Sequence, residues 1–271
     1  MSISRFVRAQ FRRCQGRMAQ SRLLRGVSCD SLEEGLDDWS NSLTDPTSYY
    51  LNCFRFFHRC APQILRDHRA YFSHHGRGFG EDAFHTMWWL LFRRFSIVNF
   101  LEIGVYRGQT LSLAATIQRH LGINGAVVGI SPFEAARDSV SKYRQDVDYL
   151  ADTRENFAHF NLPEAVLVRA YSTDEEALSM MQSRQWDCIY IDGSHEEEIA
   201  AKDWQNSSAV VRPAGLVVLD DAALKTLYRP PVFGFKGHPG PSNVAERIDK
   251  NRFREILQVG HNRVFQKIAA Q

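Results

Sequence analysis

The stretch Phe100-Leu-Glu-Ile-Gly-Val-Tyr-Arg-Gly-Gln-Thr110 is an apolar run that reaches a carboxylate and then breaks into a glycine turn. Residues 97–103 predict a buried strand, Gly104 and Gly108 predict the turn, and residues 109–120 have the pattern of a helix. A strand, a glycine turn and a helix in this order form the first unit of a nucleotide-binding sheet. The start of such a helix attracts anionic or polar ligand groups.

The carboxylate of Glu102 narrows the choice of ligand. It repels a pyrophosphate but suits a cationic ligand, such as the amino group and sulfonium of S-adenosylmethionine (SAM). Tyr106 stands where a dinucleotide-binding fingerprint has its second glycine, which disfavours NAD. The turn therefore favours a SAM-like cofactor.

The composition sets the class of protein. A chain of 271 residues, 44% hydrophobic and 24% charged, can form one substantial α/β domain with an N-terminal addition. Its net charge of +2 is too balanced to indicate binding to nucleic acid. The five cysteines are odd in number and lack a C-x-x-C pair, which argues against a disulfide framework and a zinc knuckle. With no apolar membrane span or signal peptide either, we expect a soluble, cytoplasmic protein.

Residues 1–45 form an arm whose charge changes sign. Residues 1–29 contain seven arginines and no acidic residue, interleaved with apolar residues as in a basic amphipathic helix. Such a helix could lie on a membrane surface or target an organelle. The reading we favour is a solvated helix that caps the domain or contacts a partner subunit. Residues 30–45 are rich in acidic residues, which suggests a hinge or a segment that pairs with the basic arm.

Residues 46–95 predict a helical extension rich in aromatic residues, which more often serve core or subunit contacts than a cofactor site. The glycine-bearing loop 78–82 precedes the first strand and could fold over a cofactor. Five histidines here match no common metal-ligand spacing, so we expect structural or surface roles. They are His58, His68, His74, His75 and His85.

Residues 96–271 predict the cofactor-binding domain, because strands and helices alternate as in a parallel sheet covered on both faces. The chain ends in two strands, 253–259 and 263–267, around a short turn, which predicts an antiparallel hairpin. The fold class is therefore α/β, Rossmann-like, closed by this hairpin. Between the first strand and the hairpin, the expected strands are 126–130, 165–169, 186–191 and 215–219. The expected helices are 137–150, 173–183 and 196–211.

Acidic residues follow two of the strands. Asp192 and His195 come after residues 186–191, and Asp220 and Asp221 after residues 215–219, so all four should meet at the edge of the sheet where ligands collect. Carboxylates suit a hard cation such as Mg²⁺, which lowers the pKa of a bound hydroxyl, and His195 could accept its proton. Helix and turn caps, or a structural histidine, are the alternatives. The strand positions together favour the metal site.

Three segments carry a family resemblance: the turn 102–108, Tyr190-Ile-Asp-Gly-Ser-His195 and Leu219-Asp-Asp221. They resemble the class I SAM-dependent methyltransferases related to the macrocin and mycinamicin sugar O-methyltransferases, over about residues 78–267. The resemblance implies Mg²⁺ bound by Asp192, Asp220 and Asp221, with His195 and Asp192 catalytic. It also implies that Glu102, Gly104, Tyr106 and Gly108 hold the methionine part of SAM. Further cofactor contacts are expected at Thr110, Ser131, Ser172 and Asp192.

One position departs from that pattern. The group usually has an acidic residue after the second strand for the ribose hydroxyls, and Ser131 stands there instead. A single hydroxyl cannot bind two ribose hydroxyls as a carboxylate does, although Glu134 could reach over. Ser172 is expected on the adenine side or, equally, as a helix cap.

A loop rich in proline and glycine, residues 224–243, follows the acidic pair and is expected to form a lid or substrate loop. Its expected substrate-facing residues are Arg229, Phe233, Phe235, Lys236 and His238.

The sequence thus predicts a SAM-dependent O-methyltransferase, Mg²⁺-assisted, acting on a hydroxyl of a sugar, a glycoside or another small molecule. A metal-independent methyltransferase is one alternative. A non-catalytic scaffold that uses its basic arm to bind a membrane or a partner is the other. No nucleic-acid partner is expected, and a homo-oligomer is left open.

Overall fold

A computed structural model of the chain describes residues 20, 23, 24, 26, 28–74, 76–135 and 143–269. Most of the basic segment 1–29 lies outside the described residues, and so do His75 and residues 137–142 of an expected helix. Among the described residues, no helix is both long and apolar enough to cross a membrane.

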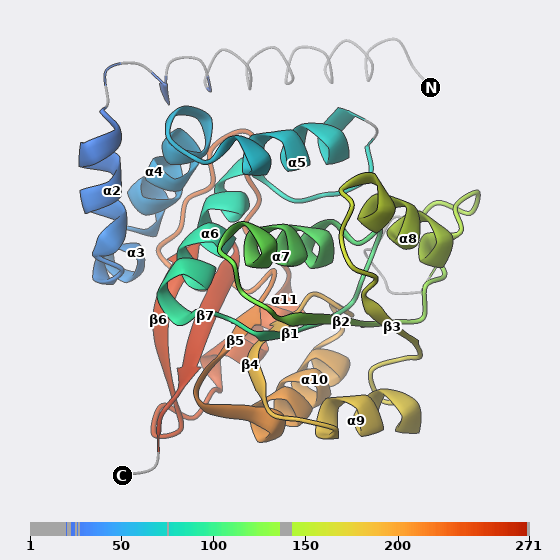
Figure 1. Cartoon of the computed structure of the whole chain (residues 1–271). Coiled ribbons are helices and arrows are strands. Elements are labelled where there is room, and N and C mark those ends of the chain that lie inside the picture. The colour runs from blue at the N-terminus through green and yellow to red at the C-terminus, as the bar shows by residue number, and fades with distance from the viewer. Residues whose placement is uncertain are drawn as a thin grey trace, which may run out of the picture.

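The N-terminal part is helical as far as the sheet. Its helices are α2 (Cys29–Asp37), α3 (Ser40–Thr44), α4 (Pro46–Arg59), α5 (Gln63–His74) and α6 (Asp82–Phe95). The acidic residues 30–45, expected as a hinge, are therefore mostly helical. Ser28 caps α2 and Asp45 caps α4 through their side chains, while Leu32 and Leu36 bury one face of α2. Figure 1 shows α2 and α3 beside α4 at one end of the molecule.

A mixed seven-stranded sheet forms the centre of the molecule. Its strands are β1 (Asn99–Ile103), β2 (Ala126–Ser131), β3 (Val166–Arg169), β4 (Trp186–Ile191), β5 (Val211–Leu219), β6 (Phe253–Val259) and β7 (Asn262–Lys267). The strand order is β3-β2-β1-β4-β5-β7-β6, in which β1 to β5 are parallel and β7 is antiparallel to both neighbours. The predicted Rossmann-like sheet with its C-terminal hairpin is confirmed.

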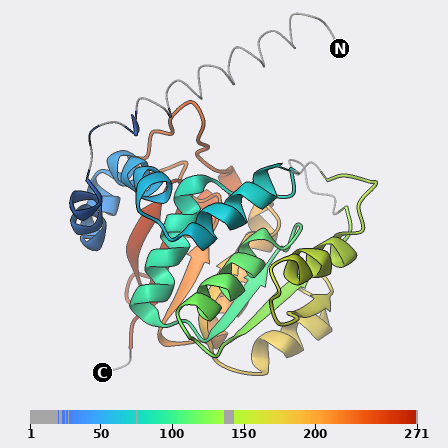
Figure 2. The same cartoon turned by 45° about the horizontal axis from the view of Figure 1, so that its top comes forward.

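Helices cover both faces of this sheet (Figures 1 and 2). One face packs against α6, α7 (Gln109–His120) and α8 (Tyr149–His159). The other packs against α9 (Glu175–Gln182), α10 (Glu197–Val210) and α11 (Pro239–Glu246). Because side chains alternate along a strand, neighbours go to different cores: Phe100 and Cys188 face the first layer, Leu101 and Ile189 the second. The division into residues 1–45, 46–95 and 96–271 stays a prediction.

The helix expected over residues 137–150 is wrong in its described part. Residues 143–148 are not helical, and α8 begins at Tyr149. The reason is local: the Asp148 carboxylate accepts a hydrogen bond from the backbone N–H of Ala151 at 3.0 Å, which starts the helix there.

The expectation against disulfides is wrong for one pair of cysteines. A disulfide joins Cys29, at the start of α2, to Cys60, directly after α4. The partners are 31 positions apart, so only the packing of the two helices brings them together. Cys53 and Cys188 are free and buried. The cytoplasmic location stays a prediction and loses the support of the cysteine count.

Candidate active site

A cavity of about 420 Å³ lies at the carboxyl ends of β1, β4 and β5. This is the edge at which parallel α/β sheets collect ligands. The structure brings most of the predicted site residues to its lining: Glu102, Gly104, Tyr106, Thr110, Asp192, His195, Asp220 and Asp221. Gly108, Ser131 and Ser172 do not line it.

The backbone conformation explains why glycine occupies positions 104 and 108 of the first turn. Gly104 has φ +95°, and a Cβ there would lie 2.0 Å from the carbonyl oxygen of Asp192. Gly108 has φ +75° at the start of α7, where a Cβ would lie 2.7 Å from a methyl group of Thr153. Only glycine therefore lets the turn lie this close to the end of β4 and to α8.

Glu102 is buried at the end of β1 and lines the cavity. Burial raises its pKa to about 8, against the effect of a hydrogen bond with the backbone of Leu111. Its Oε2 has no hydrogen-bond partner among the described residues. A buried carboxyl oxygen without a hydrogen-bond partner costs free energy. An ammonium group can donate the missing hydrogen bond and so recover this cost. The position therefore fits the amino group of SAM.

Asp192 and Asp220 lie side by side after β4 and β5, and their carboxyl groups are hydrogen-bonded to each other. Burial raises the pKa of Asp192 well above its usual value, and the charge of Asp220 raises it further. Because two buried carboxylates this close cannot both ionise readily, the pair shares a proton. Oδ1 of Asp220 has no hydrogen-bond partner among the described residues.

Asp221 faces three histidines. Its Oδ2 lies 2.9 Å from Nε2 of His195 and 3.7 Å from Nε2 of His238. Burial raises the pKa of Asp221, but the hydrogen bond from His195 and the charge of His261 outweigh it, so the pKa lies below its usual value. Since an ionised carboxylate only accepts hydrogen bonds, Nε2 of His195 carries the hydrogen, and Nδ1 is the basic atom.

His261 was not predicted as a site residue. Its Nε2 lies 3.3 Å from Oδ1 of Asp220 and 3.6 Å from Oδ1 of Asp221. It occupies the turn between β6 and β7, and β7 runs antiparallel to β5. The start of β7 therefore lies at the carboxyl end of β5. The predicted hairpin, once placed beside β5, would have pointed to this residue.

The two serines have partners within the protein. The Ser131 hydroxyl donates to the carbonyl oxygen of Val105 at 2.9 Å and is buried, while Ser172 is hydrogen-bonded to Asp203. Glu134 accepts a hydrogen bond from the Tyr171 hydroxyl at 3.1 Å. The cofactor contacts expected of both serines stay predictions.

The helical extension supplies one wall of the cavity, which the sequence suggested only for the loop 78–82. Tyr50 donates a hydrogen bond of 2.5 Å to Glu81, which in turn accepts one of 3.1 Å from the backbone N–H of Phe235. The hydrogen bonds of Glu81 thus link the helical extension to the loop 224–243 at the cavity. The lining residues from the extension are Gly78, Phe79, Gly80, Glu81, Phe84, His85 and Trp88.

Of the five residues expected to face the substrate, only Phe235 and His238 line the cavity. Phe233 packs against Phe54 instead, with ring centres 5.1 Å apart. Lys236 Nζ donates to the carbonyl oxygen of Thr226, and the backbone N–H of Arg229 donates to Thr47. Phe233, Lys236 and Arg229 thus hold the loop 224–243 in place through contacts outside the cavity lining.

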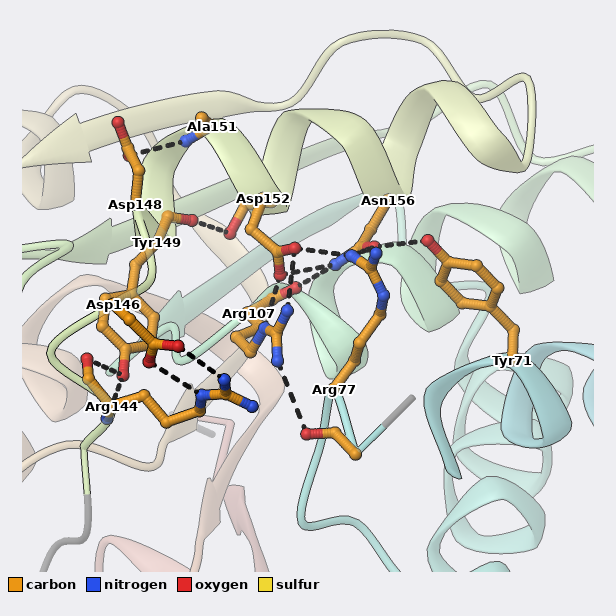
Figure 3. Close-up of polar contacts among 12 residues, drawn as sticks. Tyr71, Arg77, Arg107, Arg144, Asp146, Asp148, Tyr149, Ala151, Asp152 and Asn156 are labelled. Carbon is orange, nitrogen blue, oxygen red and sulfur yellow. Dashed lines mark hydrogen bonds and ion pairs between the residues drawn. The ribbon is translucent and has the colours of Figure 1, made fainter. Parts of the chain in front are cut away.

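A buried polar network holds the turn after β1 in place (Figure 3). Arg107 donates to both carboxylate oxygens of Asp152 on α8, at 2.5 and 2.9 Å. Arg77, from the segment after α5, donates to the same carboxylate, and Asn156 donates to the carbonyl oxygen of Arg107 at 2.7 Å. Three separate segments are thereby joined beside the cavity. Arg107, which was not predicted as a site residue, lines the cavity.

Comparison with known families adds to this geometry. Residues 101–222 match the family model described as a methyltransferase domain. This part of the chain is similar to a methyltransferase domain. It contains β1, β4 and β5 and every residue of the acidic edge, so the predictions of a class I methyltransferase fold and of an enzyme are confirmed.

Solved structures resemble most of this chain in fold. A putative caffeoyl-CoA O-methyltransferase from Staphylococcus aureus is 13% identical, with a TM-score of 0.56, 79% of this chain covered and 95% of that one. An O-methyltransferase from Bacillus cereus in complex with SAH is 15% identical, with a TM-score of 0.51 and coverages of 78% and 92%. SAH-bound methyltransferase from Podospora anserina is 13% identical, with a TM-score of 0.52 and coverages of 78% and 89%. No curated protein matches the sequence.

Proposed function

We propose that this protein is a SAM-dependent O-methyltransferase that acts on a hydroxyl of a small molecule, a sugar, a glycoside or another hydroxylated metabolite. One observation carries the proposal: the unpartnered carboxylate oxygen of Glu102 and the His195–Asp221 pair line the same cavity. The first suits the ammonium group of SAM, and the second suits removal of a proton from a hydroxyl. The SAH-bound neighbours of the same fold support SAM as the cofactor.

SAM supplies a methyl group made electrophilic by its sulfonium. The residues of the chain bind SAM and orient the groups that react. Glu102 accepts from the ammonium group, Asp221 holds the ring of His195 through Nε2, and Nδ1 of His195 accepts the proton of the acceptor hydroxyl. The acidic edge of Asp192, Asp220 and Asp221 would hold a divalent cation, for which the sequence predicts Mg²⁺, and the cation would lower the pKa of that hydroxyl.

The aromatic wall fits a small organic acceptor. Trp88, Phe84 and Phe235 line the cavity together with the polar edge, and the rings of Phe84 and Phe235 contact His261. Such rings pack against an apolar or sugar face while the carboxylates address its hydroxyls. The use of residues 1–29 at a membrane surface and a homo-oligomeric state remain predictions beside this proposal.

The test is methyl transfer from SAM with a deuterated methyl group to a panel of glycosides and other compounds with neighbouring hydroxyls, read by mass spectrometry. The proposal expects labelled methyl ethers and a loss of transfer in EDTA. Full transfer in EDTA would favour the metal-independent alternative. Label found only on nitrogen or carbon would contradict O-methylation.

A further inference from the structure

We propose that the loop between β5 and α11 docks on an anionic lipid bilayer, with Leu227 and Val232 inserted among the lipids. The loop comprises residues 222–237, and its two ends are paired through an antiparallel bridge between Ala222 and Gly237. Leu227 and Val232 do not line the cavity. The docking surface is therefore independent of the proposed function.

Exposed apolar side chains gather in this loop. Val232 is 74% exposed and Leu227 is 64% exposed. Apolar side chains concentrated on one exposed segment mark a site that binds a protein or a membrane. Of the ten large apolar side chains that are exposed in the described part of the chain, four belong to the loop: Leu224, Leu227, Val232 and Phe235.

The fold holds Leu227 and Val232 outward. The rings of Tyr228 and Phe233 pack against aromatic rings of α4, with ring centres 5.4 and 5.1 Å apart. Leu227 directly precedes Tyr228, and Val232 directly precedes Phe233. Residues 230–231 are both proline, which restricts the backbone between the two pairs. Because Tyr228 and Phe233 fill the inner positions, the exposure of their neighbours is a fixed feature of the loop, which lies beside α4 in Figure 2.

The charge of the loop fits an anionic partner. Residues 222–245 contain three basic residues and no acidic residue. Two of them, Arg229 and Lys236, lie close together, since burial and the charge of Arg229 both lower the pKa of Lys236. An anionic surface relieves the repulsion between two such cations, and each Lys or Arg near it strengthens binding.

A bilayer fits these features better than a protein or a nucleic acid. The two most exposed side chains of the loop are aliphatic, whereas protein interfaces are enriched in aromatic residues and single-stranded nucleic acids stack on them. A second basic segment meets the same helix, because the carbonyl oxygen of Leu23 accepts a hydrogen bond of 3.0 Å from Nε of Arg55 on α4. Residues 1–29 contain seven arginines and no acidic residue. Aliphatic tips beside basic residues are typical of surfaces that lie on anionic membranes.

The test uses the full chain and vesicles made of equal parts of phosphatidylcholine and phosphatidylglycerol, with binding read by co-sedimentation. We expect binding to these vesicles, and binding about tenfold or more weaker to phosphatidylcholine alone. The double substitution Leu227→Ser and Val232→Ser should weaken binding to the anionic vesicles about tenfold or more. The matched control replaces two exposed aliphatic residues elsewhere, Val166→Ser and Ile268→Ser, and should stay within about twofold of the wild type.

A fluorescent label distinguishes insertion of the loop from attachment through residues 1–29 alone. Nitrobenzoxadiazole attached at a Val232→Cys substitution, in a chain that also has Cys14→Ser, should brighten and shift its emission to shorter wavelength when anionic vesicles are added. The same label at Val166→Cys should show no change. The free cysteines of the described residues are buried and should not react with the label.

Three results would overturn the docking surface: no binding of the wild-type protein to anionic vesicles, equal binding by the two double variants, or unchanged emission of the label at position 232. A wild-type dimer that dissociates in the Leu227→Ser and Val232→Ser variant, measured by light scattering, would also overturn it, because the loop would then contact a second copy. Should that variant fail to fold by circular dichroism, the labelled protein still decides. Since none of these measurements uses SAM, failure of the methyltransferase proposal would leave their outcome unchanged.

Discussion

Nε2 of His195 lies 2.9 Å from Oδ2 of Asp221, so a carboxylate after β5 orients a histidine that follows β4. The contact links two strand ends that are neighbours in the sheet but 26 positions apart in the chain. It gives the histidine one tautomer and leaves Nδ1 as its basic atom.

Loss of this base should slow the chemical step. We expect His195→Ala to lower kcat by about 10²- to 10⁴-fold, with little change in KM or in SAH affinity. The measurement is steady-state kinetics on any acceptor found, together with SAH calorimetry. A matched control is the exposed His159→Ala. If kcat of His195→Ala stays near that of the wild type, the residue is structural.

The Arg107–Asp152 pair should contribute to stability. Asp152→Asn leaves two arginines, Arg77 and Arg107, without their carboxylate, and we expect a loss of about 3 kcal/mol in the free energy of unfolding. Urea unfolding measures it. The control is Asp146→Asn, which breaks an exposed pair with Arg144 that Figure 3 also shows, and should change little. Equal effects of the two substitutions would contradict a special role for the buried network.

Two buried histidines that stay neutral in the fold should each lower stability in mild acid, while Glu102, whose pKa is raised to about 8, acts in the opposite direction. Nδ1 of His68 lies 3.1 Å from Nε2 of His85, and burial lowers the pKa of His68 well below its usual value and that of His85 to about 3. Below pH ~6.5 the unfolded chain binds protons that the folded chain does not, so stability decreases as the pH falls. For His85 this window extends down to about pH 3.

The expected slope is about 1.4 kcal/mol per pH unit for each such histidine. Urea unfolding above and below pH ~6.5 measures it. His85→Gln should reduce the slope by one histidine's share, while the exposed His120→Gln serves as the control. An equal slope in the wild type and in His85→Gln would show that His85 is not buried as the structure has it.

The disulfide between Cys29 and Cys60 should stabilise the N-terminal helices. It closes a loop of 31 positions, for which chain entropy suggests about 3–4 kcal/mol. We expect a reductant, or the Cys29→Ser substitution, to lower Tm. Peptide mapping without reduction should find the two cysteines linked. An unlinked pair in protein from an oxidising preparation would refute the bond.

Much of the fold follows from local pattern. The apolar runs predict β1, β4 and the hairpin strands closely, because buried parallel strands have few polar positions. The helix expected over 137–150 fails because Asp148 was counted inside a helix that it caps. Cys29 and Cys60 pair only through the packing of α2 on α4, which no local pattern encodes.

The candidate site, like the fold, could be predicted from the sequence only in part. Glu102, Asp192, Asp220 and Asp221 could be placed at one edge because strand ends of a parallel sheet meet there. His261 was not placed there, since it comes from the hairpin turn, whose position beside β5 depends on tertiary packing. Glu81 belongs to the loop 78–82 that was expected over the cofactor, but its hydrogen bonds with Tyr50 and Phe235 depend on tertiary packing. Ser131 donates to the carbonyl oxygen of Val105, a contact that depends on the turn and that the sequence does not show, and its contact with the cofactor stays a prediction.

Titration of SAH into the wild-type protein and into Glu102→Gln tests the central claim most directly. We predict one SAH bound per wild-type chain, and binding about tenfold or more weaker in Glu102→Gln, because the charge-assisted hydrogen bond between the carboxylate and the ammonium group is lost. Absence of SAH binding to the wild-type protein up to about 1 mM would contradict the claim that this cavity binds SAM.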